Sequence, residues 1–346
     1  MKILRLTVDQ CDYIAEKGFT YQQNRQIENF KHVEIEKNDS LDNLDPIRMT
    51  VRKCFDHRRA KPTVDDKYIA GGGDKKGNAI LINSNEVTKA LFVETIDFFN
   101  KAIYNFSAQY DLSKKGYLAW AKVTNYYSSF FSINALLRLQ GRSISRIWKP
   151  PMGTRFQIFP FDFQREKYII CCDDVRSGGE HKIIWKLFYI IYNSYNFSNK
   201  DFEIIYKTAY NFNNDPYMEV DYRNDINYRV CYSFEEIWDP TLIETLVKEY
   251  IQNSSDHVPT TGIIKKLKVL STDPKYMYFA RSALRLLLTY SIIDSIVDAN
   301  NNIQDFWETR KENIIDFLDQ TLIKHYESDN TTLGSNLDYP LIHSFS

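Results

Sequence analysis

Apolar residues recur every three or four positions through most of the chain after residue 84, which is the period of an amphipathic α-helix. One stripe of this kind runs from Ser84, a candidate N-cap, to Tyr110. A second runs over residues 117–140, and Gly141 is a candidate stop for it. The predicted inward face of the second helix comprises Trp120, Val123, Tyr127, Phe130, Asn134 and Leu137.

The period changes between residues 142 and 172, where short β-rich runs are broken by prolines. This pattern predicts a β-hairpin or a small β insertion. Helical spacing returns over residues 180–195. An Asp215-Pro216 pair, with an N-cap followed by proline at the first helical position, predicts the start of another helix. Two later helical segments are predicted over residues 275–297 and 303–327.

These elements predict a mainly α protein with a small β insertion. We expect three parts: a mixed, partly irregular N-terminal region over residues 1–83, a helical domain over 84–253, and a helical C-terminal extension with a tail over 254–346. Few glycines and prolines, 12 and 10, accompany 24 tyrosines and 22 phenylalanines, which favours long elements packed through aromatic rings. We therefore expect the five tryptophans, Trp120 among them, to belong mostly to the core.

Charge and cysteine content narrow the function classes. The chain carries 44 Lys and Arg against 45 Asp and Glu, so no overall field attracts nucleic acid, and any such site must be local. Five cysteines, two of them adjacent, fit a reducing cytosol better than a disulfide framework. The N-terminus shows no export signal, and the apolar run over 286–293 is too short to span a bilayer. We expect a cytoplasmic protein that does not enter membranes.

The helix that opens at Asp215 carries the sequence YRNDINYR, residues 222–229. Within it, Arg223, Asn224 and Ile226 are followed by Tyr228. Positions 223 and 228 are about 140° apart around a regular helix, so these two side chains do not share a face. Their convergence on one phosphate would need a helix end or a second copy of the chain.

The order of a helix reading YYSSFFSINALLRLQG, a helix reading HKIIWKLFYIIY and a helix that opens with Arg-Asn resembles the HEPN superfamily. Its members often carry Arg-Asn, a few residues and then His on the last core helix. Here Tyr228 stands where that His is expected. The resemblance implies a helical domain that acts on RNA in prokaryotic antiviral defence or toxin systems. In its catalytic members it implies metal-independent cleavage at a dimer cleft.

A tyrosine, with an ordinary pKa near 10, is a poor general base at neutral pH, so the motif favours a degenerate site. A second pair, Arg176 and His181, has an Arg-x4-His spacing. His181, at the start of the predicted helix over residues 180–195, could supply the missing base. The plainer interpretations make His181 a helix cap and pair Arg223 with Asp225 or Glu219.

Three functions stay open. The first is an RNA-binding or assembly module that uses Arg223, Asn224 and Tyr228, with Arg176 and Arg229 as further nucleic-acid contacts. The second is an active endoribonuclease in which His181 or Tyr228 handles the proton. The third is a scaffold that binds only a protein. We expect no metal and no cofactor, and either a homodimer or a complex with the product of a neighbouring gene.

Overall fold

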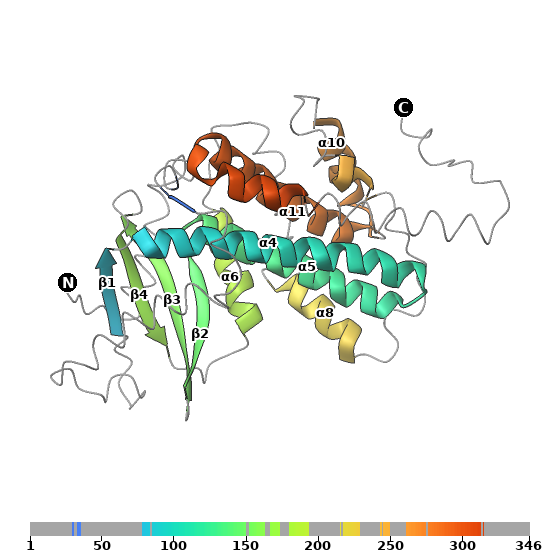
Figure 1. Cartoon of the computed structure of the whole chain (residues 1–346). Coiled ribbons are helices and arrows are strands. Elements are labelled where there is room, and N and C mark those ends of the chain that lie inside the picture. The colour runs from blue at the N-terminus through green and yellow to red at the C-terminus, as the bar shows by residue number, and fades with distance from the viewer. Residues whose placement is uncertain are drawn as a thin grey trace.

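A computed structural model shows a mainly helical protein with one four-stranded antiparallel sheet (Figure 1). It describes residues 30, 33–35, 78–83, 85–149, 152–162, 167–173, 180–193, 215, 217–228, 243, 245–249, 261–274, 276–312 and 314. Most of the predicted N-terminal region and all of the predicted tail lie outside these ranges, so the division into three parts stays a prediction. Among the helices in these ranges, none has both the length and the apolar content that a membrane crossing requires.

Two long helices, α4 (Asn85–Lys114) and α5 (Leu118–Leu139), form the centre of the molecule. Each is followed closely by a glycine with positive φ, Gly116 at 79° and Gly141 at 73°. The backbone N–H of Tyr117 donates to Leu112 at 2.8 Å, and that of Arg142 donates to Leu137 at 2.9 Å. These are Schellman closures, so the glycine stop predicted at 141 is confirmed.

The sheet lies at one end of the two long helices (Figure 1). Its strands are β1 (Asn78–Asn83), β2 (Ser143–Lys149), β3 (Met152–Asp162) and β4 (Lys167–Asp173), in the order β1-β4-β3-β2. The last three confirm the predicted β insertion. The first comes from the segment that precedes α4 and pairs with β4 in antiparallel register, Ile80 opposite Ile170. A strand from before the helical segment thus completes the sheet.

Further helices are α6 (Glu180–Asn193), α8 (Met218–Tyr228), α10 (Thr261–Leu270) and α11 (Met277–Asp298), with a 3-10 turn at Asn301–Ile303. The carboxylate of Asp215 accepts a hydrogen bond of 2.8 Å from the backbone N–H of Tyr217, which confirms the predicted cap before α8. One hydrophobic core includes residues from Phe30 to Ile314, and α5 supplies it with residues on most of its circumference.

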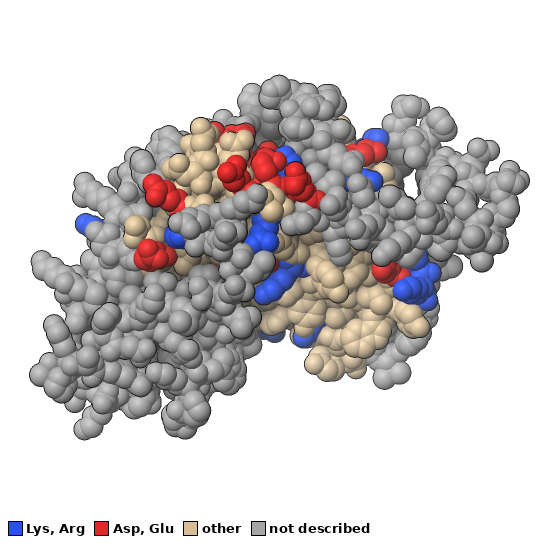
Figure 2. Space-filling view, viewed as in Figure 1, with Lys and Arg blue, Asp and Glu red and all other residues tan. Residues whose placement is uncertain are grey.

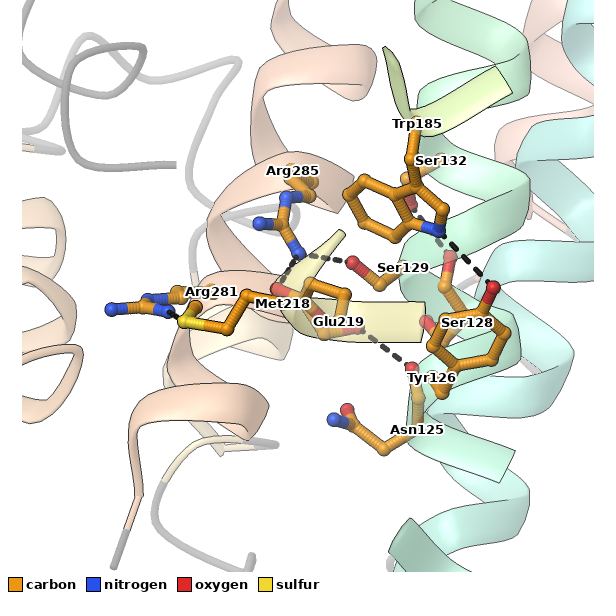
Figure 3. Close-up of polar contacts among 11 residues, drawn as sticks. Asn125, Tyr126, Ser128, Ser129, Ser132, Trp185, Met218, Glu219, Arg281 and Arg285 are labelled. Atoms are coloured by element: carbon orange, nitrogen blue, oxygen red, sulfur yellow. Dashed lines mark hydrogen bonds and ion pairs between the residues drawn. The ribbon is translucent and has the colours of Figure 1, made fainter. Parts of the chain in front are cut away.

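Buried polar groups also join the helices. Arg138 on α5 and Glu94 on α4 form an ion pair of 2.6 Å with little solvent contact. Arg285 on α11 is 0% exposed and donates to Glu219 on α8 at 2.7 Å. The same guanidinium donates to Ser129 on α5 and lies 5.0 Å from the ring of Trp185 on α6 (Figure 3). One arginine therefore connects four helices, and Glu219 is the carboxylate that balances its charge.

One expectation from the sequence is wrong. Trp185 and Trp307 are buried, 1% and 0% exposed, as predicted, but Trp120 is 64% exposed. Val123 and Phe130, from the same predicted face, are buried. The predicted inward face therefore lies at the edge of the packed surface of α5 rather than at its centre. Its first residue, Trp120, lies outside the core.

The Arg285–Glu219 pair generates a stability prediction. Glu219→Ala leaves a fully buried guanidinium without this carboxylate, and we expect a loss of about 3–5 kcal/mol in the free energy of unfolding. The matched control is Asp221→Ala on the same helix, which removes an exposed 3.6 Å pair with Lys182. We expect that control to cost less than about 1 kcal/mol. Equal losses for the two variants in urea unfolding would contradict the role given to Glu219.

Candidate functional site

Two of the residues predicted from the sequence, His181 and Arg223, meet where α6 and α8 pack on the first half of α5. The adjacent tyrosines Tyr126 and Tyr127 are the centre of this region. His181, the second residue of α6, and Arg223, in the middle of α8, both contact this tyrosine pair. We refer to His181, Arg223, Tyr126 and Tyr127 as the Arg-His cluster.

The imidazole of His181 lies among aromatic rings of α5. It stacks on Phe130 with ring centroids 4.2 Å apart and planes 13° from parallel, and it meets Tyr127 edge-on at 6.0 Å. Its Nδ1 is 2.7 Å from the hydroxyl of Tyr126. Figure 3 shows that this hydroxyl also accepts a hydrogen bond of 3.1 Å from Trp185 Nε1. His181 is thus held in one orientation by stacking and by a hydrogen-bonded chain.

This chain assigns the tautomer of His181. Burial raises the pKa of the Tyr126 phenol, so that group keeps its single proton at neutral pH. Its oxygen already accepts from Trp185, and His181 Nδ1 is the acceptor that the described residues offer to its proton. A buried hydroxyl proton without an acceptor would cost about 1–3 kcal/mol. Tyr126 therefore donates to Nδ1, and the imidazole proton resides on Nε2, at the opposite edge of the ring.

Arg223 is half-buried and bonds only to neutral groups in the part of the chain that the structure describes. Its Nη2 donates to the Tyr127 hydroxyl at 3.1 Å, and its Nη1 donates to Asn224 Oδ1 at 3.0 Å. The pairing with Glu219 that the sequence left open is not formed: the Glu219 carboxylate bonds to Arg285 at 2.7 Å, and Arg223 bonds to Tyr127 and Asn224 instead. Asp225 is not an ion-pair partner of Arg223 either.

The charge of Arg223 affects the pKa of His181, and the surrounding tyrosines affect the pKa of Arg223. Burial, together with the positive charge of Arg223, lowers the pKa of His181 to about 4. Burial alone would lower the pKa of Arg223, but the hydrogen bond to Tyr127 and the neighbouring tyrosines outweigh it, so the guanidinium pKa is raised. At neutral pH the cluster therefore presents one permanent cation, one neutral imidazole N–H and tyrosine hydroxyls. This set can bind an anion and is poorly suited to remove a proton.

The other predicted residues fall outside this cluster or at its edge. Asn224 orients the Arg223 guanidinium through their hydrogen bond, and Ile226 is buried, 7% exposed. Tyr228, in the His position of the resembled motif, is 76% exposed. Arg176 and Arg229 lie outside the described residues.

Sequence reasoning missed the residues that build the surroundings of the cluster. Tyr126, 1% exposed, was not singled out, although it holds His181 and receives the Trp185 hydrogen bond. Tyr127 was assigned only to a core face. The signal that could have found them is the pair of adjacent tyrosines, because two neighbouring helical residues point about 100° apart and can serve two flanking helices.

The described residues contain no group of three or more His, Cys, Asp or Glu side chains arranged to hold a metal ion. The donors of the Arg-His cluster are all nitrogen or hydroxyl groups, which suit an anionic oxygen ligand.

The low pKa of His181 predicts an acid-sensitive stability. Below about pH 6.5 the unfolded chain protonates this imidazole, whereas the folded chain does so only near pH 4. Stability should therefore fall as the pH drops from 6.5 toward 4, by about 1 kcal/mol at pH 5 after allowing for partial exposure. His181→Gln, which keeps an acceptor for Tyr126, should lose this component in urea unfolding at pH 7 and pH 5. An identical pH dependence in both proteins would refute it.

Comparison with known proteins found no similar protein. No protein-family model matches the chain, and neither a curated protein nor a solved structure matches it. The resemblance to the HEPN superfamily thus rests on the helix order and on Arg223, Asn224 and Ile226.

Proposed function

We propose that this protein is an RNA-binding or assembly module of a prokaryotic antiviral defence or toxin system, with a HEPN-like motif adapted to binding. The observation that carries this proposal is the state of Arg223. Its guanidinium is half-buried and bonds to the neutral oxygens of Tyr127 and Asn224 rather than to a carboxylate of the described residues. A partly desolvated cation without a counter-charge is best completed by an anionic ligand, and a planar guanidinium suits phosphate oxygens.

The imidazole supports binding over cleavage. RNA cleavage through the 2′-hydroxyl needs a lone pair that accepts the hydroxyl proton. His181 uses its Nδ1 lone pair for Tyr126 and carries its proton on Nε2, where it can donate to a phosphate oxygen but cannot act as a base. Tyr228 keeps the role of an exposed ring for hydrogen bonding or stacking, as proposed from the sequence. The defence setting is supported by the family resemblance.

A second candidate is an active metal-independent endoribonuclease. The specific observation in its favour is that His181 and Arg223 contact the same two tyrosines, so a histidine is present beside the motif arginine. An anionic substrate would raise the pKa of His181 and ease its participation in proton transfer. Incubation of the purified protein with total RNA and EDTA separates the candidates. Cleavage that persists in EDTA and disappears in Arg223→Ala would favour the enzyme.

Salt-dependent binding tests the leading proposal. We expect Arg223→Ala to weaken binding of a fluorescein-labelled oligouridylate by about 10-fold or more, since it removes charge-assisted hydrogen bonds to phosphate. The slope of log affinity against log salt should fall by about 0.7 for each lost phosphate contact. Arg223→Lys, which retains the charge but loses the planar fork, should lie between Ala and wild type.

The control is Lys266→Ala, which removes an exposed cation of α10, a helix that packs mainly on α11. It should leave affinity within about twofold of wild type, because it lies outside the proposed contact. Binding that is insensitive both to Arg223→Ala and to salt would exclude a phosphate site. A protein partner that co-purifies without RNA would then favour the scaffold.

A further inference from the structure

Beyond its first two residues, α5 is exposed to solvent along one narrow stripe. From residue 120 to the end of the helix at 139, every residue is buried except Trp120, Thr124, Tyr127 and Phe131. Their spacing of four, three and four places them on one face of the helix. Trp120 is 64% exposed, and the other three are half-buried. We call these four residues the α5 stripe.

The stripe contains three aromatic rings, although most other rings of the two long helices belong to the core. Phe131 packs on Phe98 of α4, with ring centroids 6.0 Å apart, and the ammonium group of Lys101 lies 5.3 Å from the centre of the Phe98 ring. At the middle of the stripe, the Tyr127 hydroxyl accepts from Arg223. Lys101 therefore lies near the Phe131 end of the stripe, and Arg223 lies at its middle, beside Tyr127.

The charge around the stripe is favourable for a polyanion. Lys101 is exposed on α4, and Arg223 has no carboxylate partner among the described residues. The exposed carboxylate of Asp221 is neutralised by Lys182, 3.6 Å away. On the face drawn in Figure 2, Asp and Glu gather mainly in the upper part of the described surface, while Lys and Arg are more frequent below them, with further Asp or Glu groups at both ends.

Distance along the helix sets the size of the ligand. Trp120 precedes Tyr127 by two turns, about 10 Å at 1.5 Å per residue. Stacked nucleotides advance about 3.4 Å each, so a strand with a phosphate on Arg223 would bring a base about three nucleotides away to Trp120. A duplex hides the faces of its bases within the stack, whereas a single strand exposes them to an aromatic ring.

We propose that the α5 stripe binds a single-stranded RNA segment of at least three to four nucleotides, with one base stacked on Trp120 and a phosphate on Arg223. Thr124, midway between Trp120 and Tyr127 on the same face, supplies a hydroxyl that can donate to or accept from the intervening sugar or base. This inference rests on the proposed RNA-binding function and deepens it by naming the strandedness of the ligand and the residue that stacks.

The test compares an eight-residue oligouridylate with an RNA duplex in anisotropy titrations. Trp120→Ala should weaken oligouridylate binding by about 5- to 150-fold, since one base stacked on an aromatic ring contributes about 1–3 kcal/mol. Trp120→Phe should retain most of the affinity. Any binding of duplex RNA should be unaffected by Trp120→Ala.

The matched control is Tyr104→Ala. Tyr104 is 62% exposed, like Trp120, but follows the buried Ala102 by two residues, and the carbonyl of Ala102 accepts a hydrogen bond from Ser128 of α5. Tyr104 therefore lies on the side of α4 away from α5. We expect its replacement to leave oligouridylate affinity unchanged. Circular dichroism of each variant establishes that the helical content is retained.

The outcomes distinguish this inference from the proposal on which it rests. If Trp120→Ala binds oligouridylate like wild type while Arg223→Ala does not, the stacking of a base on Trp120 is wrong, and the phosphate site at Arg223 is still supported. If both variants bind like wild type, both proposals are overturned. A protein that co-purifies with wild type but not with Trp120→Ala, in the absence of RNA, would assign the stripe to a protein partner instead.

Discussion

The buried guanidinium of Arg285 is the constraint on which the arrangement of the site depends. It is 0% exposed, bonds to Glu219 of α8 at 2.7 Å and to Ser129 of α5, and lies against Trp185 of α6. A charge in this position is stable only while its carboxylate stays in place. Because Glu219 precedes Arg223 by one helical turn, the pair that satisfies Arg285 also fixes the side of α8 that faces Tyr127.

The same packing sets the hydrogen bonding of His181. Trp185 connects the two polar groups, since its ring contacts Arg285 and its Nε1 donates to Tyr126, which in turn holds His181. The indole proton of Trp185 and the phenol proton of Tyr126 each have an acceptor, so the imidazole is left as a neutral donor at Nε2 beside the cation of Arg223. A site with these properties attracts an anion and has no free base of ordinary pKa. Tyr228, in the position where the resembled motif has a histidine, is exposed on α8.

Local signals in the sequence predicted the parts of the fold that depend on local chemistry. Gly141 ends α5 because only a residue tolerant of positive φ closes the turn. Asp215 caps α8 by accepting a hydrogen bond from the backbone N–H of Tyr217, two residues along the chain. The strand pairing of Ile80 with Ile170 could not be predicted, since it joins segments far apart in the chain. The exposure of Trp120 could not be predicted either. Periodicity shows which residues share a helix face, but it does not show which part of that face a neighbouring helix covers. Arg223 and His181 were found as candidates, whereas their common contact with Tyr126 and Tyr127 required the tertiary structure.

An NMR titration of the His181 imidazole, assigned with His181→Gln, tests the central claim most directly. In the free protein the pKa of His181 should lie near 4, because burial and Arg223 disfavour its charged form. Saturation with oligouridylate should raise that pKa, because a phosphate beside Arg223 offsets the positive charge that lowers it. An imidazole that titrates near its ordinary value of about 6.5, or whose resonances and pKa ignore the oligonucleotide, would contradict a phosphate site at the Arg-His cluster.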